Sequence, residues 1–225
     1  IRMFQTGHFF WLISAFNSSL AQTISISKNG SSSFFGESVS SLVAISSRTN
    51  DIEKTNSSFS SNLISAELYS KIKLSDRANL TLSGRRSLTD VFSSPTYKNY
   101  SNRIFQNTEI TNLNNNEIVN YKSDVDFYFY DFTIQYQQKI GQKSNLNIDV
   151  IAIENSLDFN QSTIDLNKNS KLEQENLGST IQWKTQWNKN NFTEILGYFS
   201  LYDLNSNNRT LESEQVLSQR NKVLD

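Results

Sequence analysis

Residues 126–155, DFYFYDFTIQYQQKIGQKSNLNIDVIAIEN, decide the fold class of this chain. They form two long runs joined by the polar turn Gly141-Gln142-Lys143-Ser144. Successive side chains of a strand point to opposite faces, so each run places apolar and aromatic residues on one side and mostly polar residues on the other. The apolar side carries Tyr128, Tyr130, Phe132, Ile134, Tyr136, Leu146, Ile148, Val150 and Ala152. The pattern predicts a β-hairpin about twice the usual strand length, whose apolar face meets a protein core or a lipid bilayer.

The composition excludes several classes of protein. The 225 residues carry a net charge of -1, which gives no electrostatic basis for a nucleic-acid partner. Hydrophobic residues make up 36%, mean hydropathy is -0.51, and no run approaches the ~20 apolar residues of a membrane helix. This polarity is compatible with a membrane β-barrel, because half of each barrel strand faces water. The absence of cysteine excludes disulfides, zinc-thiolate sites and thiol catalysis.

Six long alternating segments follow residue 58, and their connections predict the architecture. We expect strands over residues 59–74, 79–88, 126–140, 145–155, 175–187 and 191–204. The connections alternate between tight turns and long polar segments at 89–125, 156–174 and from 205 onward. Tight periplasmic turns and long extracellular loops alternate in this way in outer-membrane barrels, whereas a soluble sandwich has no reason to sort its loops by length.

The charged residues and the aromatics are distributed as a barrel requires. A charge on the lipid face costs roughly 2–4 kcal/mol at the bilayer midplane. In the first five segments Glu67, Lys71, Lys73, Arg85, Asp131, Asp149 and Lys184 all fall on the polar face. A half-buried soluble sheet would show the same asymmetry, and Glu194 leaves the faces of the sixth segment unassigned. Trp187, Tyr128, Tyr130 and Tyr202 lie near segment ends, as in aromatic belts, although strands generally favour Tyr and Trp. We expect Tyr128, Phe132, Ile134, Ile148 and Val150 to face lipid.

The first fifty residues have a different character. Residues 9–16, FFWLISAF, imitate a signal peptide followed by small residues, but we prefer a short buried element. Residues 23–27 and 38–47 predict two short strands around a Lys28-Asn29-Gly30 turn. Because the chain starts at Ile1 and stops at Asp225 as a new segment opens, we expect a piece of a longer protein.

Two stretches resemble the TonB-dependent outer-membrane receptors of the type common among Bacteroidota. Phe16-Asn17, Lys28-Asn29-Gly30, Phe35-Gly36 and SSLVAI at residues 40–45 resemble the closing part of that family's plug domain. Residues 83–106, SGRRSLTDVFSSPTYKNYSNRIFQ, resemble the second barrel strand and its following loop.

The resemblance implies an all-β fold: a partial transmembrane antiparallel β-barrel of about six strands, preceded by the C-terminal part of a plug. Residues 1–50 would belong to the plug and residues 51–225 to the barrel. It implies a TonB-energised importer of a scarce nutrient in the bacterial outer membrane. The expected partners are the nutrient ligand, the TonB complex through a segment outside this chain, and the lipid bilayer. The family's whole barrel has 22 strands, so six strands would leave two open edges, and the piece by itself would not transport.

Candidate binding residues follow from the second stretch. Aromatic residues and arginine are favoured at binding surfaces, which points to Tyr97, Tyr100, Arg103 and Phe105, although each could simply pack its loop. Arg85 shares a face with Thr81 and Ser83, so we expect it to point at the plug or into the channel. His8, the only histidine, lies in an apolar run and reads as a packed core residue. Residues 203–214 match the spacing of a calcium loop but carry Asn208 where glycine is needed.

No catalytic constellation, metal site or cofactor is expected, and the chain is predicted not to be an enzyme. The competing interpretation is a secreted or surface-attached β-sandwich adhesin or binding protein without a transport role.

Overall fold

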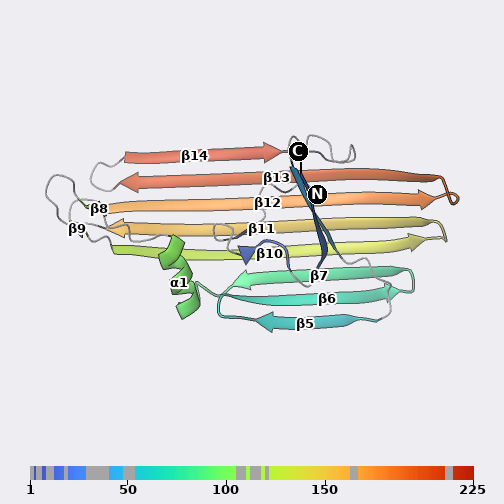
Figure 1. Ribbon diagram of the computed structural model, residues 1–225, viewed down its shortest axis with the longest axis horizontal. Coiled ribbons are helices and arrows are strands. Elements are labelled where there is room, and N and C mark those ends of the chain that lie inside the picture. Colours follow the sequence, from blue (N-terminus) through green and yellow to red (C-terminus); the bar gives the residue numbers. More distant parts are fainter. Residues whose placement is uncertain are drawn as a thin grey trace.

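The computed structural model describes residues 3, 7–8, 13–17, 20–28, 41–47, 54–104, 110–111, 118–119, 122–162, 167–210 and 215–225. Its main feature is an antiparallel eight-stranded sheet with the order β14-β13-β12-β11-β10-β7-β6-β5 (Figure 1). Strands β5 and β14 form the two edges and do not pair with each other, so the described sheet is open. The all-β prediction is confirmed at this level.

The central hairpin of the sheet is the one that the sequence predicts. Strands β10 (Lys122–Ile140) and β11 (Ser144–Ser162) pair over 19 residues each in continuous register, from Lys122↔Ser162 to Ile140↔Ser144. Gly141 closes the turn with φ of 66°, a left-handed conformation that only glycine adopts at little cost. The long alternation therefore continues through the whole hairpin without a bulge.

Two polar segments that we predicted as long loops are strand in nearly all the residues that the structure describes there. Strand β12 (Asn167–Gln186) pairs with β11, and residues 156–162 and 167–174 form the far end of this β11–β12 pair. Beyond Asn205 the chain likewise continues as strand, because the end of β13 (Phe192–Thr210) pairs with β14 (Gln215–Leu224). The strict alternation of short and long connections was therefore wrong. Polar side chains bond across these strands; Asn169 Nδ2 donates to Asp158 Oδ1 at 2.9 Å and to Asn160 Oδ1 at 2.6 Å.

The start of the sheet also differs from the prediction. Residues 59–74 are not one strand, because β5 (Asn56–Ser61) folds back on β6 (Ser65–Ser75), which pairs in turn with β7 (Ala78–Ser87). Asn62 makes this turn: its Oδ1 accepts the backbone N–H groups of Ile64 and Ser65, both at 2.8 Å. An Asx turn of this kind interrupts a strand despite an apolar pattern that continues through it.

The segment between β7 and β10 is the longest connection among the described parts of the chain, and it contains a helix that we did not predict. Helix α1 (Pro95–Ile104) begins with proline at its first position, where the missing N–H costs nothing. Ser94 caps it, since its Oγ accepts the N–H of Tyr97 at 3.1 Å. A small pair of strands, β8 (Ile110–Thr111) and β9 (Ile118–Val119), follows.

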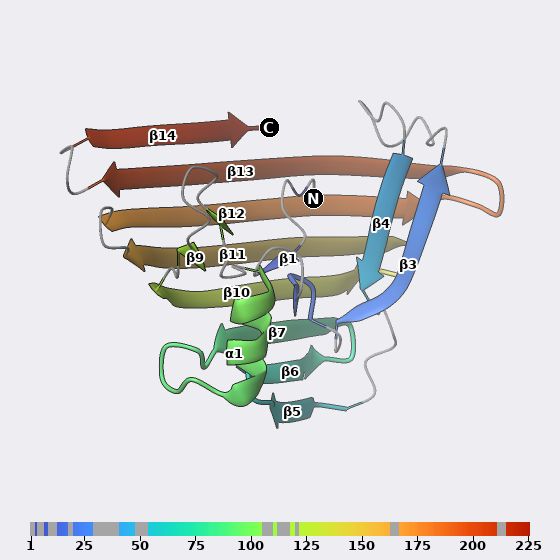
Figure 2. The same ribbon diagram turned by 60° about the vertical axis from the view of Figure 1, so that its left-hand side comes forward.

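The N-terminal strands form two small sheets of their own. Strand β1 (Gly7–His8) pairs with β2 (Ile13–Ser14), and β3 (Ala21–Lys28) pairs with β4 (Ser41–Ser47). The last two confirm the short strands predicted at 23–27 and 38–47. Figure 2 shows β1, β3, β4 and α1 in front of the same face of the large sheet. The predicted division at residue 50 stays a prediction.

We call this face, which carries Asp131, Thr133 and Gln135, the covered face, and the opposite one, which carries Phe132, Ile134 and Tyr136, the open face. Side chains opposite each other in the register share a face. The register aligns Glu67 with Arg85 and Asp131, and Lys71 with Thr81, Gln135 and Asp149, as predicted for the polar face. Glu194 pairs with Lys184 and also lies on the covered face, which settles the sixth segment.

The side that is apolar changes along the strands. We call the part from the row Asp131–Ile153–Asn176–Tyr202 to the short turns the turn-side half, and the part beyond it the far half. In the turn-side half, no described open-face residue of β6, β7 or β10–β13 is charged. These residues include Leu68, Ser70, Ile72, Leu80, Leu82, Gly84, Phe132, Ile134, Tyr136, Leu146, Ile148, Val150, Ala152, Leu177, Ser179, Ile181, Trp183, Ile195, Gly197, Phe199 and Leu201.

In the far half the open face is charged and the covered face becomes apolar. Glu154, Glu175 and Asp203 form one row of the open face. On the covered face of the same strands lie Phe127, Phe129, Leu157 and Leu172. Among the described residues, no helix is long and apolar enough to cross a membrane.

Candidate functional site

A buried polar cluster joins the described residues up to Ser47, which we call the N-terminal segment, to the covered face. Adjacent strands β7, β10 and β11 present Arg85, Asp131 and Asn155 at neighbouring positions of this face. The short strand β1 places His8 against them. His8 is 0% exposed, Asp131 4% and Asn155 6%, so the four side chains interact away from solvent. We take this cluster, His8, Arg85, Asp131 and Asn155, as the candidate functional site and call it the polar latch.

Asp131 is the centre of the polar latch. Its Oδ2 accepts from Arg85 Nε at 2.7 Å, lies 2.7 Å from Arg85 Nη2, and lies 3.1 Å from His8 Nε2. Arg85 Nη2 also donates to the backbone carbonyl of Ser14 at 2.5 Å. A buried carboxylate must be paired and hydrogen-bonded to remain charged, and this one meets both demands. Two of its donors come from the sheet and one from the N-terminal segment, so the carboxylate joins the two parts.

The imidazole of His8 is held on three sides. Nδ1 lies 2.6 Å from Asn155 Oδ1 and Nε2 faces Asp131. The ring stacks on Phe129 with 4.1 Å between centroids and 19° between planes. The Arg85 guanidinium lies 5.5 Å from the centre of the same Phe129 ring. Aromatic faces attract cations, so Phe129 supports the guanidinium that pairs with Asp131.

Further contacts flank the polar latch and hold the N-terminal segment along the sheet. Asn17 Nδ2 donates to Ser83 Oγ at 2.6 Å, and Gln135 Nε2 donates to Ser47 Oγ at 2.9 Å. An apolar cluster of Ala15 with Ile151 and Ile153 packs beside them. Most of these partners are amides and hydroxyls, so directional hydrogen bonds hold the segment more than burial of apolar area does.

Helix α1 is attached in a different way. Tyr97 packs in an apolar cluster with Phe127, Phe129 and Leu157. Its hydroxyl donates to the carbonyl of Val125 at 2.7 Å. Burial, above all, raises the pKa of Tyr97 to about 12, so the phenol stays protonated as a donor. The helix thus covers the apolar part of the covered face, next to the polar latch.

The structure distributes the five predicted binding residues unevenly. Arg85 points at the N-terminal segment, where it donates to the carbonyl of Ser14, and its place beside a plug or a channel stays a prediction. Tyr97 is 6% exposed, with its hydroxyl bonded to the chain's own backbone. Tyr100 and Arg103 lie on α1, but their side chains are outside what the structure describes, and Phe105 lies outside the described residues. Ligand binding by these five residues stays a prediction.

Sequence reasoning placed His8 in a core but missed its partners. Asp131 and Arg85 were assigned to the polar face, where they could have met water, the plug or a ligand. Asn155 was treated only as the end of a strand. The signal in the sequence was Asp131 following Phe127 and Phe129 on the same face, because a carboxylate beside buried aromatics needs a buried donor.

Charged side chains of the open face lie in the far half, and some of them form pairs. Arg220 makes two hydrogen bonds to the Asp203 carboxylate, at 2.9 and 2.6 Å, and this pairing lowers the pKa of Asp203. Burial and the neighbouring Glu175 and Glu173 raise the pKa of Glu154. Asp203 to Thr210, the described part of the calcium-loop spacing, lie in β13 as extended strand. Across the described ranges, no three His, Cys, Asp or Glu side chains gather as a metal site.

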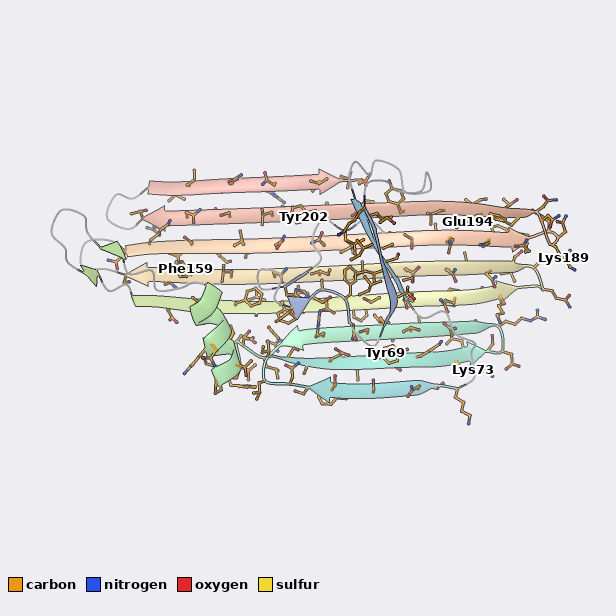
Figure 3. All side chains as sticks on the ribbon, in the orientation of Figure 1. Tyr69, Lys73, Phe159, Lys189, Glu194 and Tyr202 are labelled. Atoms are coloured by element: carbon orange, nitrogen blue, oxygen red, sulfur yellow. The ribbon has the colours of Figure 1, made fainter. Side chains whose placement is uncertain are left out.

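On the covered face, Glu194 lies near the turn that carries Lys189, and Tyr202 lies further along β13 (Figure 3). Gln182 Nε2 donates to Glu194 Oε1 at 2.6 Å, and Lys184 lies 3.9 Å from its other oxygen. This carboxylate therefore belongs to the polar surface of the sheet.

Comparison with known proteins adds no relative: no protein-family model, curated protein or solved structure matches the chain.

Proposed function

We propose that the eight-stranded sheet is part of the wall of an outer-membrane β-barrel, with its open face against lipid, in a TonB-dependent receptor. In this proposal residues 1–50 belong to the plug, and the whole protein imports a scarce nutrient such as a siderophore, vitamin or glycan. The nutrient, the TonB complex and the outer-membrane bilayer are the partners. The observation that carries the proposal is the inverted polarity of the turn-side half, whose open face is uncharged and mostly apolar and whose covered face is mostly polar.

The size of the apolar band supports a bilayer as the missing partner. On β10 the band runs from Phe132 to Ile140, about nine residues, which span roughly 30 Å at the usual strand rise. With the ~40° tilt of barrel strands its height becomes roughly 23 Å, close to the ~25 Å apolar band of such barrels. Monomeric soluble proteins rarely expose apolar patches above a few hundred Å². Here Ile181 is 53% exposed, Trp183 48% and Ile195 63%.

The residues at the edge of the band support the same proposal. Tyr128 and Tyr130 lie where the open face turns from apolar to charged, as aromatic residues do at membrane interfaces. Tyr130 donates its hydroxyl to Glu154, the first acidic side chain beyond the band on β11. The polar covered face, held to the N-terminal segment by the polar latch, is the arrangement expected of a barrel interior that contains a plug.

Single cysteines provide the test, because the chain has none of its own. Ile134→Cys and Ile181→Cys place a label on the open face, whereas Gln135→Cys and Gln182→Cys place it on the covered face of the same strands. Each variant is labelled with a fluorophore in outer-membrane vesicles and exposed to lipids that carry a quencher in the acyl chain. We expect quenching at 134 and 181 and little at 135 and 182.

Equal quenching at all four positions, or none, would contradict the lipid-facing assignment. Absence from the outer-membrane fraction, together with secretion of a folded chain, would favour the adhesin alternative. Import is tested separately: cells that lack the whole protein should lose growth on one scarce nutrient, and loss of TonB should reproduce that defect.

A further inference from the structure

We propose that the polar latch is a proton-dependent clamp, in which protonation of His8 tightens the hold of the sheet on the N-terminal segment. The clamp is one contact within the chain, and it is independent of whether the open face meets lipid.

Both ring nitrogens of His8 face acceptors. Nε2 lies 3.1 Å from the Asp131 carboxylate, which can only accept, and Nδ1 lies 2.6 Å from the amide oxygen of Asn155. A neutral imidazole carries one N–H, whereas the imidazolium carries two. The arrangement of Asn155 therefore matches the imidazolium, in which each nitrogen donates one hydrogen bond.

The neutral ring requires a different arrangement. Asn155 would have to rotate its amide by about 180°, so that Nδ2 donates to Nδ1. Among the described residues Asn155 Nδ2 has no hydrogen-bond partner, and after the rotation the amide oxygen would be the atom without a partner instead. Loss of the proton thus replaces a charge-assisted hydrogen bond with a neutral one, and charge-assisted bonds are about twice as strong.

The charges around His8 act in the same direction. Asp131 on β10 is the charged group in direct contact with the ring, and it attracts the imidazolium. The positive charge of Arg85 on β7 disfavours the imidazolium, but the same carboxylate neutralises that charge. Glu67 on β6 lies beside Arg85 in the register. The face of Phe129 stacks on the ring and favours a cation. Asn155, on β11, contributes no charge of its own.

The consequence concerns the N-terminal segment. Histidine is the side chain whose ordinary titration falls closest to neutral pH. At lower pH the imidazolium links β1 to β10 and β11 through two donated hydrogen bonds. As the pH rises and the proton leaves, one of them is lost unless Asn155 rotates. The segment is then held more loosely beside β7.

The state of His8 can be read directly, because it is the only histidine. NMR of the folded chain labelled with ¹⁵N-histidine shows one pair of ring nitrogens. We expect two N–H signals at low pH, and a neutral ring with its proton on Nε2 at high pH. A ring that stays neutral down to the pH at which the chain unfolds would overturn the proposal.

Docking of the segment is measured with Ala15→Cys, a position 1% exposed beside Ile151 and Ile153. Its labelling rate is divided by that of Ser60→Cys on the exposed edge strand β5, which removes the pH dependence of the thiol reaction. We expect this ratio to be about ten-fold lower at pH 5.5 than at pH 8, the effect of one charge-assisted hydrogen bond.

Two variants make the result specific. His8→Gln still donates to Asp131 but cannot titrate, so the ratio should become independent of pH. Asn155→Asp offers Nδ1 a carboxylate that cannot donate, so the transition should move to higher pH. A flat ratio in the parent chain, an unchanged pH dependence in His8→Gln, or an unmoved transition in a folded Asn155→Asp would each overturn the clamp.

Discussion

The two halves of the large sheet use the same strands in opposite ways. In the turn-side half most apolar side chains lie on the open face, and the face that the N-terminal segment covers is mostly polar apart from the cluster of Ala15 with Ile151 and Ile153. In the far half most charges, including Glu154, Glu175 and Asp203, lie on the open face, and Phe127, Leu157 and their neighbours pack under α1. The far half thus resembles an ordinary soluble sheet with a helix over its apolar side. A strand's alternation thus specifies two faces, while the surroundings specify which of them is buried.

The reversal occurs within one step of β10. Phe129 and Asp131 are successive covered-face residues; one belongs to the apolar cluster under α1 and the other to the polar latch. Tyr130 and Phe132 are the corresponding open-face residues at the edge of the apolar band. On each face the kind of side chain changes at this row. One change of environment along the strands accounts for both changes, and in the proposed function that change is the surface of the bilayer.

The largest expected effect comes from loss of a charge in the polar latch. Asp131→Ala leaves Arg85 buried without its carboxylate, and breaking a buried ion pair costs about 3–5 kcal/mol. Asp203→Ala removes a carboxylate from the exposed pair with Arg220 in the far half, and little change is expected there. Denaturant unfolding of both variants measures the difference. A similar loss in both would show that burial in the latch is not what matters.

An arginine on the open face tests the reversal itself. Ile134→Arg places a charge within the apolar band, and in a bilayer this should cost about 2–4 kcal/mol. Asn207→Arg makes the same addition on the open face of the far half, where the neighbours are already charged. Unfolding from lipid vesicles gives the free energy of each. Equal tolerance at the two positions would remove the distinction between the halves.

The smallest expected effect concerns the attachment of α1. Tyr97→Phe removes the hydrogen bond to Val125 and should cost about 1 kcal/mol. Tyr128→Phe, on the open face, is the matched control and should cost less. Hydrogen exchange of the α1 amides reports the loss locally, and alkaline titration of the parent chain should show a tyrosine that ionises near pH 12. Early ionisation of every tyrosine would contradict the burial of Tyr97.

Much of the sheet could be predicted from local patterns. The faces of Glu67, Arg85, Asp131 and Asp149 followed from their positions in alternating runs, and the register confirms them. The turn at Gly141 followed from its glycine and polar neighbours. Predictions failed where an asparagine side chain redirects or joins strands: Asn62 turns the chain inside an apolar run, and Asn169 bonds to Asp158 and Asn160 on the neighbouring strand.

The sequence by itself determined that this chain is β-rich, that its long strands have two faces of different polarity, and, in the first five segments, which side chains share a face. These properties depend on the period of two in a strand, which is local. Only the tertiary structure decided that the polar face is the covered one, that the apolar side changes at Asp131, and that His8 meets Asp131 and Asn155. Those contacts join residues 123 and 147 positions apart, and no local period relates residues so far apart.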